Sequence, residues 1–310
     1  MARKKTAVVG AGWFGRAHCR VYNAISDLRA IADSDEERGK QVAESLHINY
    51  YPDYKEMIKQ EDLDAVSIVV PPRFIPLIAK DFVEKGINVL LEKPLGTNLE
   101  DVEQLLNYSS DVRITCGFIE RFNPVVERLI KRLPEIGTPI MISSKRIGRY
   151  PKRYWDLGVV LDLGIHEIYI QRFLFGDVTD IQSKLSYFHR EKGTFEDAAF
   201  ILLEFSNNVQ GLIEVNWLTP TKYRKLSVYG SEGVMEIDYS TQELKFIRSS
   251  EEPTKQLFRV EETNEPYSTE EPLQLELNSF LYGKENPFPL EEGIKSLEIA
   301  LKCLTFKCLK

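Results

Sequence analysis

The sequence is poor in several features that mark other classes of protein. Its 310 residues include four cysteines, four histidines and an acidic excess that gives a net charge of −7. An acidic chain is a poor match for the phosphates of a nucleic acid, so we expect no nucleic-acid partner. A helix that crosses a bilayer needs about 18 consecutive apolar residues, and every apolar run of this chain is much shorter, so we expect no membrane span.

The few cysteines show neither a metal-binding nor a disulfide pattern. Cys19, Cys116, Cys303 and Cys308 form no C-x-x-C pair and have no ligand-like spacing to a histidine. We therefore expect small buried thiols in a reducing compartment and no bound metal. Because no signal peptide is expected ahead of the first apolar run, the sequence favours a cytoplasmic protein.

The first 118 residues alternate short apolar runs with amphipathic segments, which predicts a parallel sheet with helices on both faces. At 43% hydrophobic and 28% charged, the chain is long enough for two globular domains. The expected strands are Thr6–Val9, Leu28–Ala32, Ala65–Val70, Asn88–Leu91 and Arg113–Gly117. The expected helices are Trp13–Ile25, Asp35–Leu46, Asp53–Lys59, Arg73–Lys85 and Leu99–Tyr108.

The pattern changes after residue 118, where long strand-like runs predict a mostly antiparallel open sheet. The runs are Ile140–Ile147, Ile181–Phe188, Ala198–Phe205, Val209–Trp217, Lys225–Tyr229, Val234–Ile237 and Leu244–Ile247. Helices are predicted from Pro124, just after Asn123, to Pro134 and over Val159–Phe173. Because few helices remain to cover such a sheet, we expect self-association into a homodimer or homotetramer through its free face.

These patterns predict an α/β fold of two domains. Residues 1–118 would form an N-terminal Rossmann domain that binds a dinucleotide, and residues 119–290 an α+β domain for substrate binding and oligomerisation. The acidic segment 250–272 is expected to be a surface connection. The spacing of Ile294, Leu297, Leu301 and Leu304 predicts an amphipathic helix over 291–307, placed to pack back on the first domain.

A glycine-rich turn follows the first predicted strand and opens a predicted helix. Glycines at this spacing allow a tight turn, a close approach of backbone N–H groups to a pyrophosphate, and close packing of the helix on the strand. The turn reads Gly10-Ala11-Gly12-Trp13-Phe14-Gly15, and its glycines and aromatic residues are expected to contact the cofactor. Between a strand and a helix, this motif predicts a dinucleotide site and says nothing of the substrate.

Asp33 ends the next predicted strand, about 20 residues beyond the turn, where an acidic residue accepts hydrogen bonds from the adenosine ribose. Because its carboxylate would repel a 2′-phosphate, we expect NAD rather than NADP. Arg38 is the residue that would reverse this preference by holding such a phosphate. Pro71, directly after the strand Ala65–Val70, is also expected to contact the cofactor.

Glu92-Lys93-Pro94 follows the fifth predicted strand directly. This position places Lys93 at the carboxyl end of a parallel strand, beside the nicotinamide end of a cofactor that runs across the sheet. A lysine there can donate to a substrate oxygen and carry a proton. Glu92 and Lys93 are also expected to contact the cofactor. The alternative is an ordinary surface lysine after a strand.

Asp162 and His166 are four residues apart in an apolar segment, so a helix would project both from one face. Such a pair could face a substrate cleft. The alternative is a buried histidine satisfied by a neighbouring carboxylate. Metal binding is less favoured, because no third or fourth ligand lies at suitable spacing.

Taken in order, these motifs resemble those of the Gfo/Idh/MocA oxidoreductases, named for glucose–fructose oxidoreductase and inositol dehydrogenase, over nearly the whole chain. The resemblance implies a Rossmann domain, a second domain with a large open sheet that makes dimers or tetramers, and NAD(P)-dependent oxidation or reduction of a sugar or cyclitol carbon. It implies that Lys93, Asp162 and His166 are the active-site lysine, aspartate and histidine. One departure is Ile75, where many members carry a histidine.

The segment Gly117-Phe118-Ile119-Glu120-Arg121-Phe122-Asn123-Pro124 is similar to one in the UDP-sugar members, notably the UDP-N-acetylglucosamine 3-dehydrogenase branch. This resemblance implies a nucleotide sugar oxidised at C3. Arg121 suits a substrate diphosphate, and Asn123 and Arg146 are further candidate substrate contacts. Asn123 is equally a good helix N-cap, and the basic residues equally a solvated face. An inositol or free-hexose dehydrogenase and a non-catalytic NAD(P)-binding regulatory protein remain alternatives.

Overall fold

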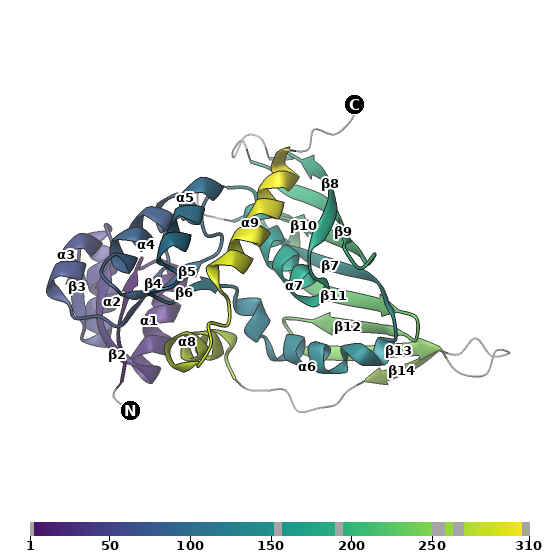
Figure 1. The fold of residues 1–310 in the computed structure, drawn as a ribbon, viewed down its shortest axis with the longest axis horizontal. Helices are drawn as coiled ribbons and strands as arrows, with labels where there is room; N and C mark the ends of the chain where they lie inside the picture. The colour runs from purple at the N-terminus through teal and green to yellow at the C-terminus, as the bar shows by residue number, and fades with distance from the viewer. Residues whose placement is uncertain (1–2, 152–156, 190–194, 250–257, 263–269, 306–310) are drawn as a thin grey trace. The chain divides into compact units, whose positions relative to one another are not determined.

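The computed structural model describes residues 3–151, 157–189, 195–249, 258–262 and 270–305 (Figure 1). The chain divides into two compact units, each with its own sheet. The first combines residues 1–119 with 271–297, and the second combines 120–270 with 298–310. Within the described ranges, no helix has both the length and the apolar character needed to cross a bilayer.

The first unit contains a six-stranded parallel sheet in the order β3-β2-β1-β4-β5-β6. Its strands are β1 (Lys5–Val9), β2 (Asp27–Ala32), β3 (Asn49–Tyr51), β4 (Ala65–Ile68), β5 (Asn88–Glu92) and β6 (Ile114–Gly117). Its helices are α1 (Trp13–Ile25), α2 (Glu36–Leu46), α3 (Tyr54–Gln60), α4 (Ile75–Val83), α5 (Leu99–Glu103), α8 (Pro272–Tyr282) and the first part of α9 (Leu290–Thr305). The predicted Rossmann sheet is confirmed, and β3 is the strand that the sequence did not predict.

Helix α8 was not predicted from the sequence. It belongs to this first unit, although its residues fall within the range 119–290 expected for the second domain. It packs on α1, and Leu273, Leu277 and Phe280 join the apolar core around Tyr22. Arg113, at the start of β6, donates to the carbonyl oxygens of three residues at the end of α8, namely Ser279, Phe280 and Gly283, at 3.3, 2.8 and 2.8 Å. The carbonyl oxygen of Ser279 also accepts from the backbone N–H of Gly283 at 2.9 Å, so Arg113 reinforces the C-terminal cap of α8.

The second unit contains an eight-stranded sheet in the order β14-β13-β12-β11-β7-β10-β9-β8. All its neighbouring strands pair antiparallel except β10 and β7, so the predicted mostly antiparallel sheet is confirmed. The strands are β7 (Pro139–Arg149), β8 (Val178–Ser186), β9 (Ala198–Phe205), β10 (Gln210–Asn216), β11 (Leu218–Gly230), β12 (Val234–Asp238), β13 (Glu243–Ser249) and β14 (Phe258–Glu262). Strand β14 lies where a surface connection was expected, and 250–257 and 263–269 fall outside the described residues.

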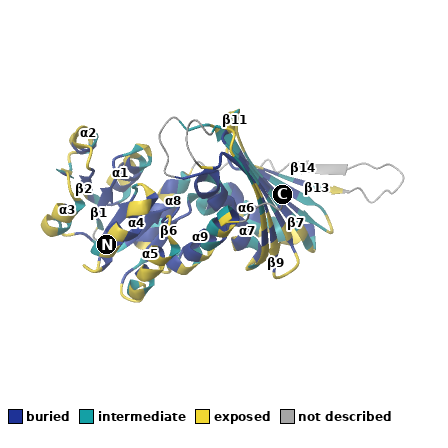
Figure 2. Cartoon of the chain, turned by 90° about the horizontal axis from the view of Figure 1, so that it is seen from above, coloured by how far each residue is buried: buried dark blue, intermediate teal, exposed yellow. Residues whose placement is uncertain are grey.

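Helices cover one face of this sheet. Helix α6 (Pro124–Arg132) packs on β12 and β13, while a π-helical turn (Val160–Gly164) and α7 (Ile165–Phe175) pack on β7 and β10. The residues of β9 show the two faces, because Ala199, Ile201 and Leu203 are buried whereas Phe200 and Leu202 are exposed (Figure 2). The predicted apolar helix over Val159–Phe173 is confirmed, and its first residues form the π-turn. We call the helix-covered side of the sheet the inner face and the other side the outer face.

Candidate active site

The glycine turn of the first unit has a geometry that other residues cannot adopt. Gly10 has a φ of +104°, and a Cβ there would lie 2.1 Å from the carbonyl oxygen of Val69. A Cβ on Gly15 would lie 1.8 Å from the carbonyl oxygen of Gly10. Gly12, by contrast, faces open space and caps α1 without a side-chain acceptor. The first N–H groups of α1 are thus left for a ligand, which fits the pyrophosphate of a dinucleotide. Trp13, beside this opening, is exposed.

Asp33 lies at the end of β2, close to the glycine turn. Its Oδ2 accepts from the backbone N–H of Ala11 at 2.5 Å, and its Oδ1 accepts from the backbone N–H of Asp35 at 2.8 Å. Arg38 donates to the same Oδ1 at 2.8 Å, and this hydrogen bond raises the pKa of the guanidinium. Arg38 is thus held by Asp33, whose carboxylate stands where an adenosine ribose is expected. Pro71 is exposed after β4, and Ile75 is buried in α4.

Glu92 and Lys93 follow the end of β5, but the two side chains differ in burial. Glu92 is buried, its Oε1 lies 3.2 Å from Nε2 of the buried His18 of α1, and its Oε2 accepts from the backbone N–H of Lys93 at 3.2 Å. Gly117 leaves the space for this carboxylate, because a Cβ there would lie 2.7 Å from Glu92 Oε1. Glu92, an expected cofactor contact, thus links α1 to the backbone of the partly exposed Lys93.

In the second unit, the helix that carries Asp162 and His166 is anchored at its start. Asp162 lies in the π-turn and His166 in the first turn of α7, and both side chains are mostly buried. The backbone N–H groups of Val159 and Val160 donate to the carbonyl oxygen and Oε1 of Glu196, each at 3.0 Å. Burial raises the pKa of this Glu196 carboxyl. Sequence reasoning missed Glu196, because nothing in its spacing connects it with the helix.

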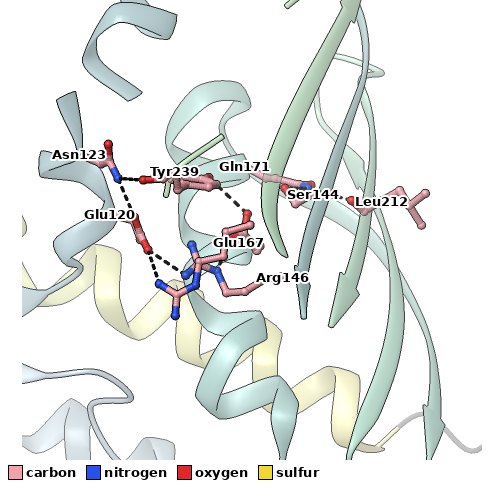
Figure 3. A network of polar contacts seen from close by, with 9 residues as sticks. Glu120, Asn123, Ser144, Arg146, Glu167, Gln171, Leu212 and Tyr239 are labelled. Atoms are coloured by element: carbon pink, nitrogen blue, oxygen red, sulfur yellow. Dashed lines mark hydrogen bonds and ion pairs between the residues drawn. The ribbon is translucent and has the colours of Figure 1, made fainter. Parts of the chain in front are cut away.

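The face of α7 toward the sheet is held by a buried ionic network (Figure 3). Arg146 of β7 donates from Nε to Glu167 at 2.5 Å and from Nη1 to Glu120 at 2.8 Å. Tyr239 completes the network, with its hydroxyl 3.3 Å from Glu167 Oε2 and its ring 5.1 Å from the Arg146 guanidinium. Burial opposes the charge of Glu120, but Arg146 and Arg224 hold the pKa of this carboxyl below its ordinary value.

One turn further along α7, a second polar side chain fixes the same face. Gln171 donates from Nε2 to the hydroxyl of Ser144 at 2.9 Å and to the carbonyl oxygen of Leu212 at 3.1 Å. Glu167 and Gln171 are four residues apart and therefore lie on one face of the helix. With this face bound to the sheet, His166 projects from a different side of α7.

The three expected substrate contacts have different environments. Asn123 is buried, accepts from the backbone N–H of Val125 at 3.2 Å as the N-cap of α6, and donates to the carbonyl oxygen of Tyr239 at 3.0 Å. Arg146 is buried and enclosed by its two carboxylates, so both of these expected substrate contacts are bonded to groups of the protein itself. Arg121 is partly exposed, with its guanidinium 4.3 Å from the ring centre of the exposed Phe173.

The first unit thus has the features of a dinucleotide-binding domain, and the second unit carries the expected Asp162–His166 pair on a separate helix. Residues 4–116 match the model of the oxidoreductase family with an NAD-binding Rossmann fold, and residues 131–236 match the Gfo/Idh/MocA C-terminal domain. The chain therefore belongs to the Gfo/Idh/MocA oxidoreductase family, and NAD as its cofactor is confirmed. Among the described residues, no group of three or more His, Cys, Asp or Glu side chains could hold a metal ion.

Similar proteins include sugar and polyol dehydrogenases. The chain is 30% identical over 178 residues to UDP-N-acetylglucosamine 3-dehydrogenase of Acidithiobacillus ferrooxidans. The aligned region covers 57% of this chain and 56% of the relative. It is 28% identical over 249 residues to myo-inositol 2-dehydrogenase of Thermotoga maritima, covering 74% and 73% of the two chains.

Solved structures share the fold over almost the full chain. The Acidithiobacillus ferrooxidans UDP-N-acetylglucosamine 3-dehydrogenase has a TM-score of 0.87 at 23% identity and covers 97% of this chain and 96% of its own. A levoglucosan dehydrogenase in complex with NADH and levoglucosan has a TM-score of 0.86 at 20% identity, covering 97% and 96%. At these identities the likeness concerns the fold.

Replacing Asp33 with alanine is expected to weaken NAD binding by about tenfold or more, because hydrogen bonds to a charged acceptor are lost. NADP binding should weaken less, since the same carboxylate repels a 2′-phosphate. Titration of intrinsic fluorescence with each dinucleotide measures both affinities. Asp53→Ala, which removes the N-cap of α3, is the control and should leave both unchanged. Equal losses for NAD and NADP would contradict the assignment.

Replacing Arg146 with methionine is expected to lower the free energy of unfolding by about 3–5 kcal/mol, because Glu120 and Glu167 would be left buried without their cation. Urea denaturation measures the change. Lys145→Met is the matched control, since Lys145 is the adjacent, half-exposed residue paired with Glu214 at 2.9 Å, and it should cost less than about 1 kcal/mol. A stable Arg146→Met protein with a raised KM would instead restore Arg146 as a substrate contact.

Proposed function

We propose that this protein is an NAD-dependent dehydrogenase that oxidises a CH–OH carbon of a sugar, and that its substrate is a UDP-N-acetylhexosamine oxidised at C3. The observation that carries the proposal is the anchoring of the helix that bears Asp162 and His166. Glu196 holds its first turn, and Glu167 and Gln171 hold its sheet-facing side. A histidine carried on a helix fixed to this degree suits directed proton transfer better than general packing.

The residues divide the reaction between them. His166 accepts the hydroxyl proton, since a neutral imidazole is a suitable base near neutral pH. Lys93 stabilises the developing alkoxide as a hydrogen-bond donor, and Asp162 orients the substrate or His166. Bound NAD supplies the hydride acceptor, and the glycine turn with Asp33 would hold it.

The nucleotide-sugar part of the proposal is supported by one relative and one side chain. The relative is the UDP-N-acetylglucosamine 3-dehydrogenase already described. The side chain is Arg121, whose partly exposed guanidinium rests on Phe173 and would pair with a substrate diphosphate. The inositol dehydrogenase among the relatives supports the alternative of a cyclitol or free hexose.

His166→Asn is expected to lower kcat by about 10²- to 10⁴-fold while leaving the affinity for NAD unchanged, because a general base is lost and the first unit is untouched. The assay follows reduced-nicotinamide absorbance with UDP-N-acetylglucosamine, its uronic acid, UDP-glucose, myo-inositol and glucose. His47→Asn is the matched control, since His47 is an exposed residue with a φ of +56° that asparagine also tolerates. If His166→Asn retains most of its kcat, Lys93 becomes the candidate base.

We also propose that the protein forms a homodimer or homotetramer through the outer face of its large sheet. Phe200 and Leu202 of β9 are 48% and 51% exposed on this face, an unusual position for two apolar side chains on one strand. The compartment that we propose is the cytoplasm, because Cys19, Cys116 and Cys303 are free buried thiols.

Light scattering on a sizing column is expected to give a dimer or tetramer for the natural chain and a smaller species for the double variant Phe200→Glu, Leu202→Glu, because charges would be buried in the interface. Leu77→Glu is the control, since Leu77 is an exposed residue of the first unit and should not change the mass. A natural chain that is monomeric at micromolar concentration would refute the proposal.

A further inference from the structure

Two arginines lie side by side on the inner face of the large sheet. Arg224 of β11 is the register partner of Arg146 of β7. Leu226 and Val228, which alternate with outward-facing residues along β11, are buried on the same face as Arg224. Like charges at directly opposite positions of antiparallel strands destabilise a sheet unless other charges compensate them.

The compensation is divided unequally between the two guanidinium groups. Arg146 holds Glu120 at 2.8 Å and Glu167 at 2.5 Å. Arg224 has a longer contact, 3.6 Å, with the same oxygen of Glu120. The side chain of Arg146 is 2% exposed, whereas that of Arg224 is 33% exposed. Arg224 therefore shares a carboxylate that Arg146 already holds more closely, and part of its guanidinium remains accessible.

The electrostatic surroundings of Arg224 favour a further anion. Burial and the neighbouring Arg146 lower the pKa of Arg224, and Glu120, Glu167 and Asp162 offset this only in part. An arginine stays protonated at neutral pH, so the shift means that its charge is incompletely balanced.

We propose that Arg224 binds an oxyanion of the substrate, a phosphate or a carboxylate, at the inner face of the large sheet. A guanidinium presents paired N–H donors that match either group, and an incoming anion would supply the balance that Glu120 does not. The inference rests on the proposed function in one respect, that the inner face of the sheet near α7 receives the substrate. It gives Arg224 the substrate-binding role that the sequence suggested for Arg146.

The test is calorimetric titration of the NAD-loaded protein with UDP, UDP-N-acetylglucosamine, its uronic acid and free N-acetylglucosamine. Arg224→Met should raise the Kd of the anionic ligands about ten- to hundredfold and leave that of the neutral sugar unchanged. Lys225→Met is the matched control, since Lys225 is the next residue of β11, projects to the outer face and lies 3.9 Å from Asp238. It should bind every ligand as the natural chain does.

A second variant separates binding from folding. Arg224→Lys keeps the positive charge beside Arg146 and Glu120, so it should fold normally. It loses the paired N–H donors, so it should bind the anionic ligands more weakly than the natural chain does. Weaker binding of UDP itself identifies the phosphate as the ligand group. Weaker binding confined to the uronic acid identifies the carboxylate.

The inference is overturned if Arg224→Met and Arg224→Lys bind all anionic ligands like Lys225→Met, or if the natural chain binds none of them. Parallel absorbance assays keep this result apart from the proposed function. Arg224-dependent binding of UDP-sugars without reduction of NAD would leave the inference standing and remove the proposed activity. Oxidation of a neutral sugar with a KM unaffected by Arg224→Met would do the opposite.

Discussion

The burial of Arg146 between Glu120 and Glu167 is the constraint on which the second unit depends. A buried ion pair often adds little net stability over apolar residues, because both charges must lose their water. It does impose geometry, since the strand, the helix and the segment before α6 must meet at one point (Figure 3). With Glu167 bound to Arg146, and Gln171 bound to Ser144, α7 cannot rotate without leaving a charge unpaired.

The same network explains why the segment around residues 120–123 has its particular composition. Glu120 is a ligand of Arg146, and Asn123 joins the start of α6 to the backbone of Tyr239. Both residues therefore serve the packing of this unit. Glu120 and Asn123 of this segment are thus occupied by internal contacts, whereas Arg121 is partly exposed.

Local patterns made much of the fold predictable, whereas long-range contacts were not. The glycine turn and the alternating β9 follow from neighbouring residues, and both were predicted. Strand β3 has three residues, and α8 joins the first unit through long-range contacts such as those with α1 and Arg113. The position of Asp33 beside the glycine turn was predictable from its distance along the sequence. The contacts of His18 with Glu92 and of Glu196 with the start of the π-turn join chain segments that meet only after folding.

The register between β7 and β11 has a consequence that neither strand shows alone. It places Arg224 opposite Arg146, so one carboxylate, that of Glu120, must serve two cations. Because Arg146 is the more deeply buried, it needs the closer contact, and the partly exposed Arg224 can be completed from solvent or by a ligand. Because Glu120 is held close to Arg146, its carboxylate balances the charge of the neighbouring Arg224 only in part. A fixed structural charge and an available binding charge arise from the same pairing of strands.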